Sequence, residues 1–144
     1  MSNLARAIRH RVEWANRRPR ERGRRLMRFA MLICDVDQNH DARIAERDPQ
    51  DGMAAVWAWF ERWEKAGKIA HGGAELATAS KAKTIRAGAD GGPVVTDGPY
   101  LELKEVVGGV VLLNAKDIDE AVAIASEWPI SGASSIEIRP VIEH

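Results

Sequence analysis

The most informative absences in this 144-residue sequence concern cysteine and long apolar runs. Cys34 is the single cysteine, so the chain has no internal disulfide, and with four histidines it offers a poor ligand set for zinc. No apolar run approaches the roughly 18 residues of a membrane span, and no secretory signal is visible. These absences favour a cytoplasmic protein without a membrane segment.

Sequence motifs of common cofactor and nucleophile sites are absent as well. The chain lacks the G-x-x-x-x-G-K-[ST] phosphate loop, a G-x-G-x-x-G fingerprint after a strand, the H-E-x-x-H zinc motif and the G-x-S-x-G elbow. Cys34 lies in a short apolar run and is interpreted as a small core residue, not a nucleophile. We therefore expect no metal and no cofactor.

Charge is unevenly distributed, although the formal net charge is zero. Residues 1–28 carry ten arginines against two glutamates, whereas the remaining residues carry 11 basic and 19 acidic side chains. We interpret residues 1–26 as an Arg-rich extension, mobile or partly helical, and residues 27–144 as the folded domain. The arginines are the only hint of a nucleic-acid partner, which is not expected because no recognised binding motif accompanies them.

The hydrophobic pattern of the domain predicts two helices over an antiparallel sheet. Apolar or alternating runs predict strands at 28–34, near 69, and at 82–87, 93–96, 110–113 and 135–141. Helical spacing predicts one helix over 50–66, which Asp48 caps and Gly67 ends. It predicts a second helix that Asp117 caps, with Glu120 three positions later. The order β-α-β-β-(β)-α-β predicts an α+β, ferredoxin-like fold.

The first predicted helix is rich in tryptophan. Trp59 lies off its apolar stripe and is expected to mark a subunit contact. The other large apolar side chains recur at helical spacing and are expected to face the core; they are Met53, Val56, Trp57, Phe60 and Trp63.

Two glycine-containing segments follow in the second half of the chain. Asp97-Gly98-Pro99 has the composition of a tight turn, because glycine adopts positive φ and proline fixes its own φ. Gly108-Gly109 predicts a β-bulge or a close approach of two backbones.

These segments belong to longer strings that resemble one protein family. The strings "VTDGPYLELKEVVGGVVLL", "DIDEAVAIASEWP" and "IEIRPV" are similar to the DGPF branch of the YCII-related family, with Tyr100 where phenylalanine is usual. The first strand segment "MRFAMLIC" and the segment "GKIAHGGAEL" also agree with the family pattern, so the resemblance covers about residues 27–141.

The resemblance implies a ferredoxin-like subunit of the dimeric α/β-barrel type. It implies a homodimer whose sheets face one another, and a pocket for an unknown small molecule between sheet and helices. Two functions stay open: acid–base catalysis of a lyase- or isomerase-like kind on a small organic substrate, or a non-catalytic ligand-binding or regulatory module linked to transcription.

Asp97 is the first candidate for a catalytic residue. A carboxylate beside a glycine turn suits a general base or a group that orients a histidine, but Asp-Gly-Pro is also ordinary turn chemistry. Family branches with a proposed His–Asp pair have the histidine in the first helix, and this helix contains none. His71, just after the helix, is therefore the candidate partner, with His40 second.

Lys104 and Glu105 complete the predicted catalytic set. A lysine beside carboxylates binds an anionic or carbonyl group while a carboxylate moves a proton. Glu75 and Glu102 belong to the same polar group, and the alternative for all of them is a surface ion pair without function. Arg139 is expected to pair with an acidic residue of a partner subunit.

Overall fold

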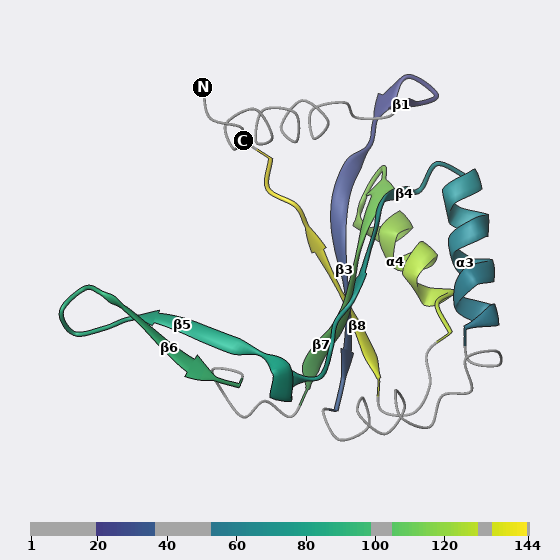
Figure 1. Cartoon of the computed structure of the whole chain (residues 1–144). Helices are drawn as coiled ribbons and strands as arrows, with labels where there is room; N and C mark the ends of the chain where they lie inside the picture. The colour runs from purple at the N-terminus through teal and green to yellow at the C-terminus, as the bar shows by residue number, and fades with distance from the viewer. Residues whose placement is uncertain (1–19, 37–52, 99–104, 130–133, 144) are drawn as a thin grey trace, which may run out of the picture.

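The structure, a computed structural model, describes residues 20–36, 53–98, 105–129 and 134–143 (Figure 1). No helix within these ranges is long and apolar enough to cross a membrane. In chain order the elements are β1 (Arg20–Glu21), β2 (Arg24–Arg25), β3 (Met27–Asp35), α3 (Ala54–Lys65), β4 (Ile69–Glu75), the 3-10 turn η1 (Ala79–Lys81), β5 (Lys83–Ala87), β6 (Pro93–Asp97), β7 (Val106–Ala115), α4 (Ile118–Ser126) and β8 (Ser135–Pro140).

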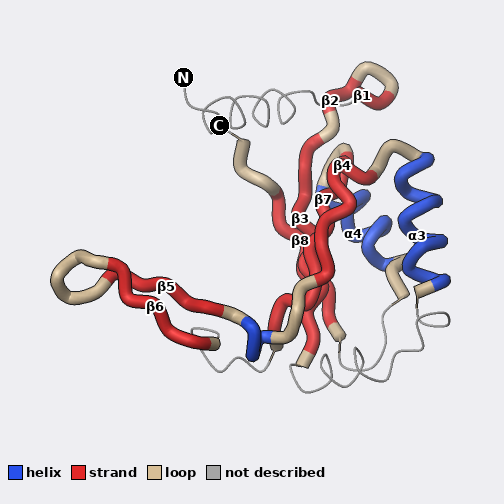
Figure 2. Tube along the Cα trace, viewed as in Figure 1, coloured by secondary structure: helices blue, strands red, loops and turns tan. Residues whose placement is uncertain are grey.

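The main sheet has four antiparallel strands in the order β4-β7-β3-β8. Both α3 and α4 lie on one face of this sheet, to the right in Figures 1 and 2. This arrangement confirms the predicted α+β class, and the strand order is compatible with a ferredoxin-like fold. The opposite face of the sheet carries no described helix.

The core lies between the sheet and the two helices. On β3, Phe29 and Met31 point to the helices and are buried, and on β7 Leu113 does the same. The intervening residues Ala30 and Leu32 are only half-buried, as expected where alternate side chains of a strand point to opposite faces. Burial therefore identifies the helix-covered face as the core.

Helix α3 packs differently from the prediction. Trp59 is buried, and its indole nitrogen donates a hydrogen bond of 3.1 Å to the carbonyl oxygen of Ile124 in α4. Trp57, predicted to face the core, is 62% exposed. The expected role of Trp59 at a subunit contact was wrong, because α3 is contacted by α4 as well as by the sheet.

Both helix ends predicted from capping residues are present. Asp117 accepts a hydrogen bond of 2.8 Å from the backbone N–H of Glu120, which fixes the start of α4. Gly67, with φ of +72°, ends α3. The start of α3 is at Ala54, later than the predicted residue 50, and the proposed cap Asp48 lies outside the described residues.

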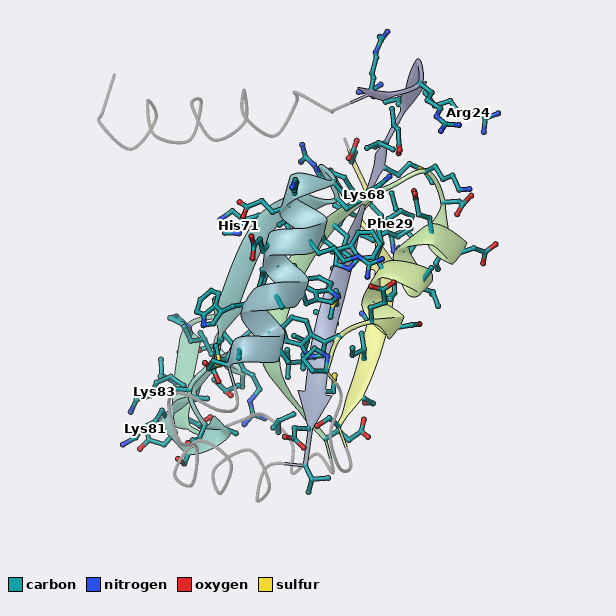
Figure 3. All side chains as sticks on the ribbon, turned by 90° about the vertical axis from the view of Figure 1, so that its right-hand side faces the viewer. Arg24, Phe29, Lys68, His71, Lys81 and Lys83 are labelled. Atoms are coloured by element: carbon teal, nitrogen blue, oxygen red, sulfur yellow. The ribbon has the colours of Figure 1, made fainter. Side chains whose placement is uncertain are left out.

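The end of the Arg-rich extension forms a short hairpin that contacts the domain. Strands β1 and β2 pair through a two-residue turn at Arg22 and Gly23, whose positive φ angles suit such a turn. Glu21 bonds to the buried Lys68, and Lys68 donates a further hydrogen bond of 2.9 Å to Glu120. This network, near Lys68 and Arg24 in Figure 3, joins the extension to the domain.

Strands β5 and β6 form a separate two-stranded ribbon, residues 83–97, which we call the arm. Neither strand pairs with the main sheet. The arm extends away from the domain on the side opposite the helices (Figures 1 and 2). It carries Asp97 at its base.

Candidate functional site

A cavity of about 1300 Å³ lies between α3 and the helix-covered face of the sheet. Its floor comes from the middle of β4 and β7, and its helical wall comes from one side of α3. Trp128 and Pro129, just after α4, close one side, and Asp35 stands at the end of β3. The cavity therefore opens between elements that the fold holds together.

Glycines create the space above the sheet. Gly72 and Gly73 of β4 and Gly108 and Gly109 of β7 all line the cavity. Gly73 has φ of +70°, and a Cβ there would overlap the carbonyl oxygen of Val110, so glycine is required. The β3–β7 register shifts beside Gly108 and Gly109, which confirms the predicted irregularity. Because these glycines have no side chains, the space between α3 and the sheet stays open at this point.

Aromatic rings form much of the opposite wall. Trp57 and Phe60 of α3 line the cavity together with Trp128. The rings of Phe60 and Trp128 meet edge to face with centroids 5.8 Å apart, and Trp59 holds Trp128 from behind at 5.0 Å. Because edge-to-face packing restrains the rings of Phe60 and Trp128, this part of the aromatic wall is fixed before any ligand arrives.

Asp35 is the most buried acidic group on the cavity wall. It is 1% exposed, and its Oδ1 accepts a hydrogen bond of 2.9 Å from the backbone N–H of Val36. Exposed charged groups stand around the cavity as well: Glu61, Glu64, Lys65 and Glu75. A buried carboxylate beside an aromatic cavity is suited to bind a hydrogen-bond donor or to exchange a proton with a bound molecule.

Further polar groups lie near Asp35 at the end of β3. Glu105 immediately precedes β7 and accepts a hydrogen bond of 3.3 Å from the hydroxyl of Ser135. Ser135 is paired in register with Cys34. Burial, then the charges of Glu105 and Glu137, raise the pKa of the Cys34 thiol, while Arg139 opposes the shift. The thiol is therefore held protonated, as a core cysteine rather than a nucleophile.

Asp97 lies outside this cavity. Its side chain is 85% exposed at the base of the arm and forms an ion pair with Lys83, the residue opposite it in register. The following Gly98 has φ of +82°, and its N–H donates to the carbonyl oxygen of Ala82. The positive φ expected of Gly98 is present, whereas Pro99 lies outside the described residues. No described residue joins Asp97 to the cavity.

His71 and Asp97 are not brought together. His71 is exposed on β4, and its Nδ1 accepts a hydrogen bond of 2.9 Å from the backbone N–H of Gly73. Figure 3 places His71 beside the upper part of α3 and Lys83, the partner of Asp97, at the lower end. His71 is next to the cavity-lining Gly72 without lining the cavity itself.

The remaining candidates divide between described and undescribed segments. Glu105 stands near Asp35, as above, and Glu75 lines the cavity. Lys104, Glu102 and His40 lie outside the described residues. Arg139, expected to pair with a partner subunit, is paired with Glu137 of its own strand. Within the described part of the chain, no three His, Cys, Asp or Glu side chains gather as a metal site would require.

Asp35 was not among the residues selected from the sequence. The predicted first strand ends at residue 34, and Asp35 directly follows its apolar run. A carboxylate at that position lies at the end of a central strand, where the sheet and the helices diverge. That position is the one feature of the sequence that could have identified it.

Two comparisons with known proteins agree with this architecture. Residues 27–144 match the model of the YCII-related domain. The chain is also 30% identical over 112 residues to an uncharacterised protein of Rhizobium meliloti (strain 1021), covering 76% of this chain and 89% of that protein. The match begins at Met27, the first residue of β3, and leaves out the β1–β2 hairpin.

Proposed function

The chain belongs to the YCII-related family, and on that premise we propose that it binds a small organic molecule in the cavity between α3 and the sheet. The observation that carries the proposal is the combination of a cavity of about 1300 Å³, a fixed aromatic wall and the buried Asp35. Ligand sites of proteins are typically concave and mostly apolar, with a few placed polar groups.

The wall chemistry supports a ligand with an apolar, planar body. Trp57, Phe60 and Trp128 offer ring faces and edges, and the glycine floor lets a flat molecule approach the sheet backbone closely. Asp35, when ionised, only accepts hydrogen bonds. The ligand therefore presents an N–H or O–H group to this carboxylate.

Three probes of one shape test this proposal: 2-phenylethylamine, 2-phenylethanol and phenylacetate. Trp57 and Trp128 line the cavity, so binding changes tryptophan fluorescence. We expect the amine to bind most tightly and phenylacetate, which offers no donor at neutral pH, most weakly, by about tenfold or more, or at least about 1.4 kcal/mol. No fluorescence response to any of the three would contradict the proposal.

A variant of Asp35 tests its part in recognition. Asp35→Asn keeps the side-chain shape and can still accept from Val36, but it removes the negative charge. We expect the preference for the amine over 2-phenylethanol to disappear in this variant. Asp119→Asn, an exposed carboxylate in the first turn of α4, is the matched control and keeps the preference.

Acid–base catalysis at the same place is a second candidate, and the burial of Asp35 favours it. Burial of a carboxylate beside an apolar cavity is a common means of fitting it for proton transfer. Phenylacetone has benzylic protons that a base removes, so accelerated deuterium uptake from D2O, followed by NMR, would report this activity. Acceleration lost in Asp35→Asn supports catalysis, whereas binding without acceleration supports a non-catalytic ligand-binding module.

A further inference from the structure

The β1–β2 hairpin, residues 20–25, carries four arginines that no acidic residue neutralises. Arg20, Arg22, Arg24 and Arg25 are all exposed, and no ion pair of the described residues includes any of them. The hairpin stands beyond the ends of both helices (Figure 2). One end of the molecule therefore presents four positive charges to solvent.

The single acidic residue of the hairpin is bound elsewhere. Glu21 lies opposite Arg24 in the register of the two strands, where opposite charges would attract each other. Glu21 instead forms its ion pair with Lys68, which is buried in the domain. This pair attaches the hairpin to the domain and leaves the four arginines with their full charge.

Two of these arginines occupy positions that do not favour arginine. Arg20 lies directly opposite Arg25, and like charges in such a pair destabilise the strands. Arg22 has φ of +47° and is the single non-glycine residue with positive φ in the described part of the chain. Two-residue hairpin turns of this kind favour asparagine, aspartate or glycine there. Strained residues of this kind are commonly found at functional sites.

We propose that the hairpin binds the phosphate backbone of a nucleic-acid duplex without reading its base sequence. A guanidinium group forms paired hydrogen bonds with phosphate and keeps its charge throughout the physiological pH range. A phosphate between Arg20 and Arg25 replaces their mutual repulsion with two attractions. A nucleic-acid partner was not expected from the sequence, because no binding motif accompanies the arginines, and the hairpin now provides a folded scaffold for them.

The form of the hairpin favours a duplex over a lipid surface. Arg20 and Arg25 lie on one face of the two-stranded ribbon, Arg24 lies on the other, and Arg22 is at the turn. A ribbon that enters a groove of a duplex has phosphates on both sides, whereas a flat membrane surface contacts one face. Residues 20–25 also contain no apolar side chain that could enter a bilayer.

The rest of the domain differs from the hairpin in charge. Residues 29–144 carry 11 basic and 19 acidic side chains, so they repel a polyanion and direct it to the hairpin. The match to the YCII-related domain begins at Met27, so the hairpin lies outside the matched residues. This proposal is therefore independent of the ligand proposed for the cavity.

Fluorescence anisotropy of a labelled DNA duplex, titrated with the full chain, tests the proposal. Each neutralised phosphate releases counterions, so the logarithm of the binding constant falls with the logarithm of salt concentration, with a slope of about −0.9 per contact. With four such contacts, we expect binding to weaken at least about 100-fold between about 50 and about 200 mM NaCl. Two duplexes of unrelated sequence should bind equally.

Two hairpin variants separate binding from folding. Arg22→Asn suits the turn better than arginine does, and Arg20→Gln/Arg25→Gln removes the like-charge pair, so neither should lower the thermal midpoint. We expect each arginine removed to make the salt slope shallower by about 0.9 and to weaken binding about five- to tenfold at about 100 mM NaCl. Arg62→Gln/Arg139→Gln is the matched control, because it removes two arginines that already form ion pairs on α3 and β8. This control should bind as the wild type does.

Three results would overturn the proposal. The first is a wild type that binds neither duplex, and the second is a salt slope that the hairpin variants leave unchanged or that the control variant changes equally. The third is tighter binding to vesicles of phosphatidylserine and phosphatidylcholine in equal parts than to the duplexes, which would assign the hairpin to a lipid surface.

Discussion

Lys68 supports the sharpest stability prediction, because it is buried between two carboxylates. Its side chain is 7% exposed, and it bonds to Glu120 at 2.9 Å and to Glu21. Burial alone would lower the pKa of Lys68, but its hydrogen bonds to Glu21 and Glu120 outweigh burial and raise it. Lys68 is therefore charged in the folded protein and forms ion pairs with both carboxylates.

We predict that Lys68→Met lowers the free energy of unfolding by about 2 kcal/mol at pH 7. Removing one partner of a fully buried ion pair costs roughly 3–5 kcal/mol, and the value here is smaller because Glu21 is half-exposed and Glu120 is partly solvated. Methionine keeps the apolar stem of lysine, so the change reports mainly on charge. Urea unfolding followed by tryptophan fluorescence measures the difference.

The pH dependence separates this reasoning from a general packing defect. Burial raises the pKa of Glu120, but the N–H of Lys116 and the ammonium of Lys68 outweigh it, so the net pKa is lowered from its ordinary value of 4.5. A carboxyl group whose pKa is lowered by folding stabilises the fold above pH 4.5. This stabilisation is lost as the pH falls through the pKa of the folded state. The penalty of Lys68→Met should therefore be present at pH 7 and should shrink below pH 4.5.

A double-mutant cycle completes the test. Glu120→Gln removes the charge that Lys68→Met leaves without its partner, while the amide oxygen still accepts from Lys116. We expect the double variant to be more stable than the sum of the single changes predicts, by about 1 kcal/mol or more. A penalty for Lys68→Met below 0.5 kcal/mol, or one independent of pH and of Glu120, would refute the reasoning.

Three further predictions follow from single contacts. Trp59→Phe loses the indole hydrogen bond and part of the core, so it should lower the free energy of unfolding by about 1–3 kcal/mol, whereas Trp57→Phe should change it by less than about 0.5 kcal/mol. Gly73→Ala should destabilise the protein far more than Gly72→Ala, as measured by thermal midpoints, because only the first meets backbone atoms and has positive φ. Cys34 should react with a thiol reagent at pH 8 much more slowly in the native than in the unfolded protein, and equal rates would contradict its burial.

The parts of the fold that follow from local chemistry could be predicted from the sequence. Asp117 and Gly67 act within one helical turn, so their roles as caps depend little on distant residues. The alternation of Ile136 and Ile138 with polar residues likewise identifies β8 and its core face. Such signals specify elements and their order, and hence the α+β class.

Features that depend on contacts from two directions could not be predicted in this way. An apolar stripe on a helix predicts a single buried face. Helix α3 packs against the sheet and also against α4, so the buried tryptophan is Trp59 instead of Trp57. The arm is a related case, because alternation in 82–87 predicts a strand without saying which sheet it joins. The contact of the β1–β2 hairpin with the domain is made through Lys68, 47 residues from Glu21 in the sequence.

The candidate site was the least predictable part. Asp97 was chosen for its local motif, yet it lies on the arm. The cavity is made by glycines of β4 and β7 and by aromatic residues of α3 and of the segment after α4. Asp35 acquires its position only from the meeting of β3, β7 and β8. The family resemblance thus implied the fold and a pocket between sheet and helices, but it did not identify the residues that line the cavity.

The most direct test of the proposed function fills the cavity and measures binding. Gly109 lies on its floor, and a Cβ there would sit 3.4 Å from Cδ1 of Ile33, an ordinary contact that leucine tolerates before extending into the open space. Tryptophan fluorescence titrations with 2-phenylethylamine should give at least about tenfold weaker binding for Gly109→Leu than for the wild type. The control Ala123→Leu, on the exposed side of α4, should bind as the wild type does. Equal binding by Gly109→Leu and wild type would contradict a ligand site between α3 and the sheet.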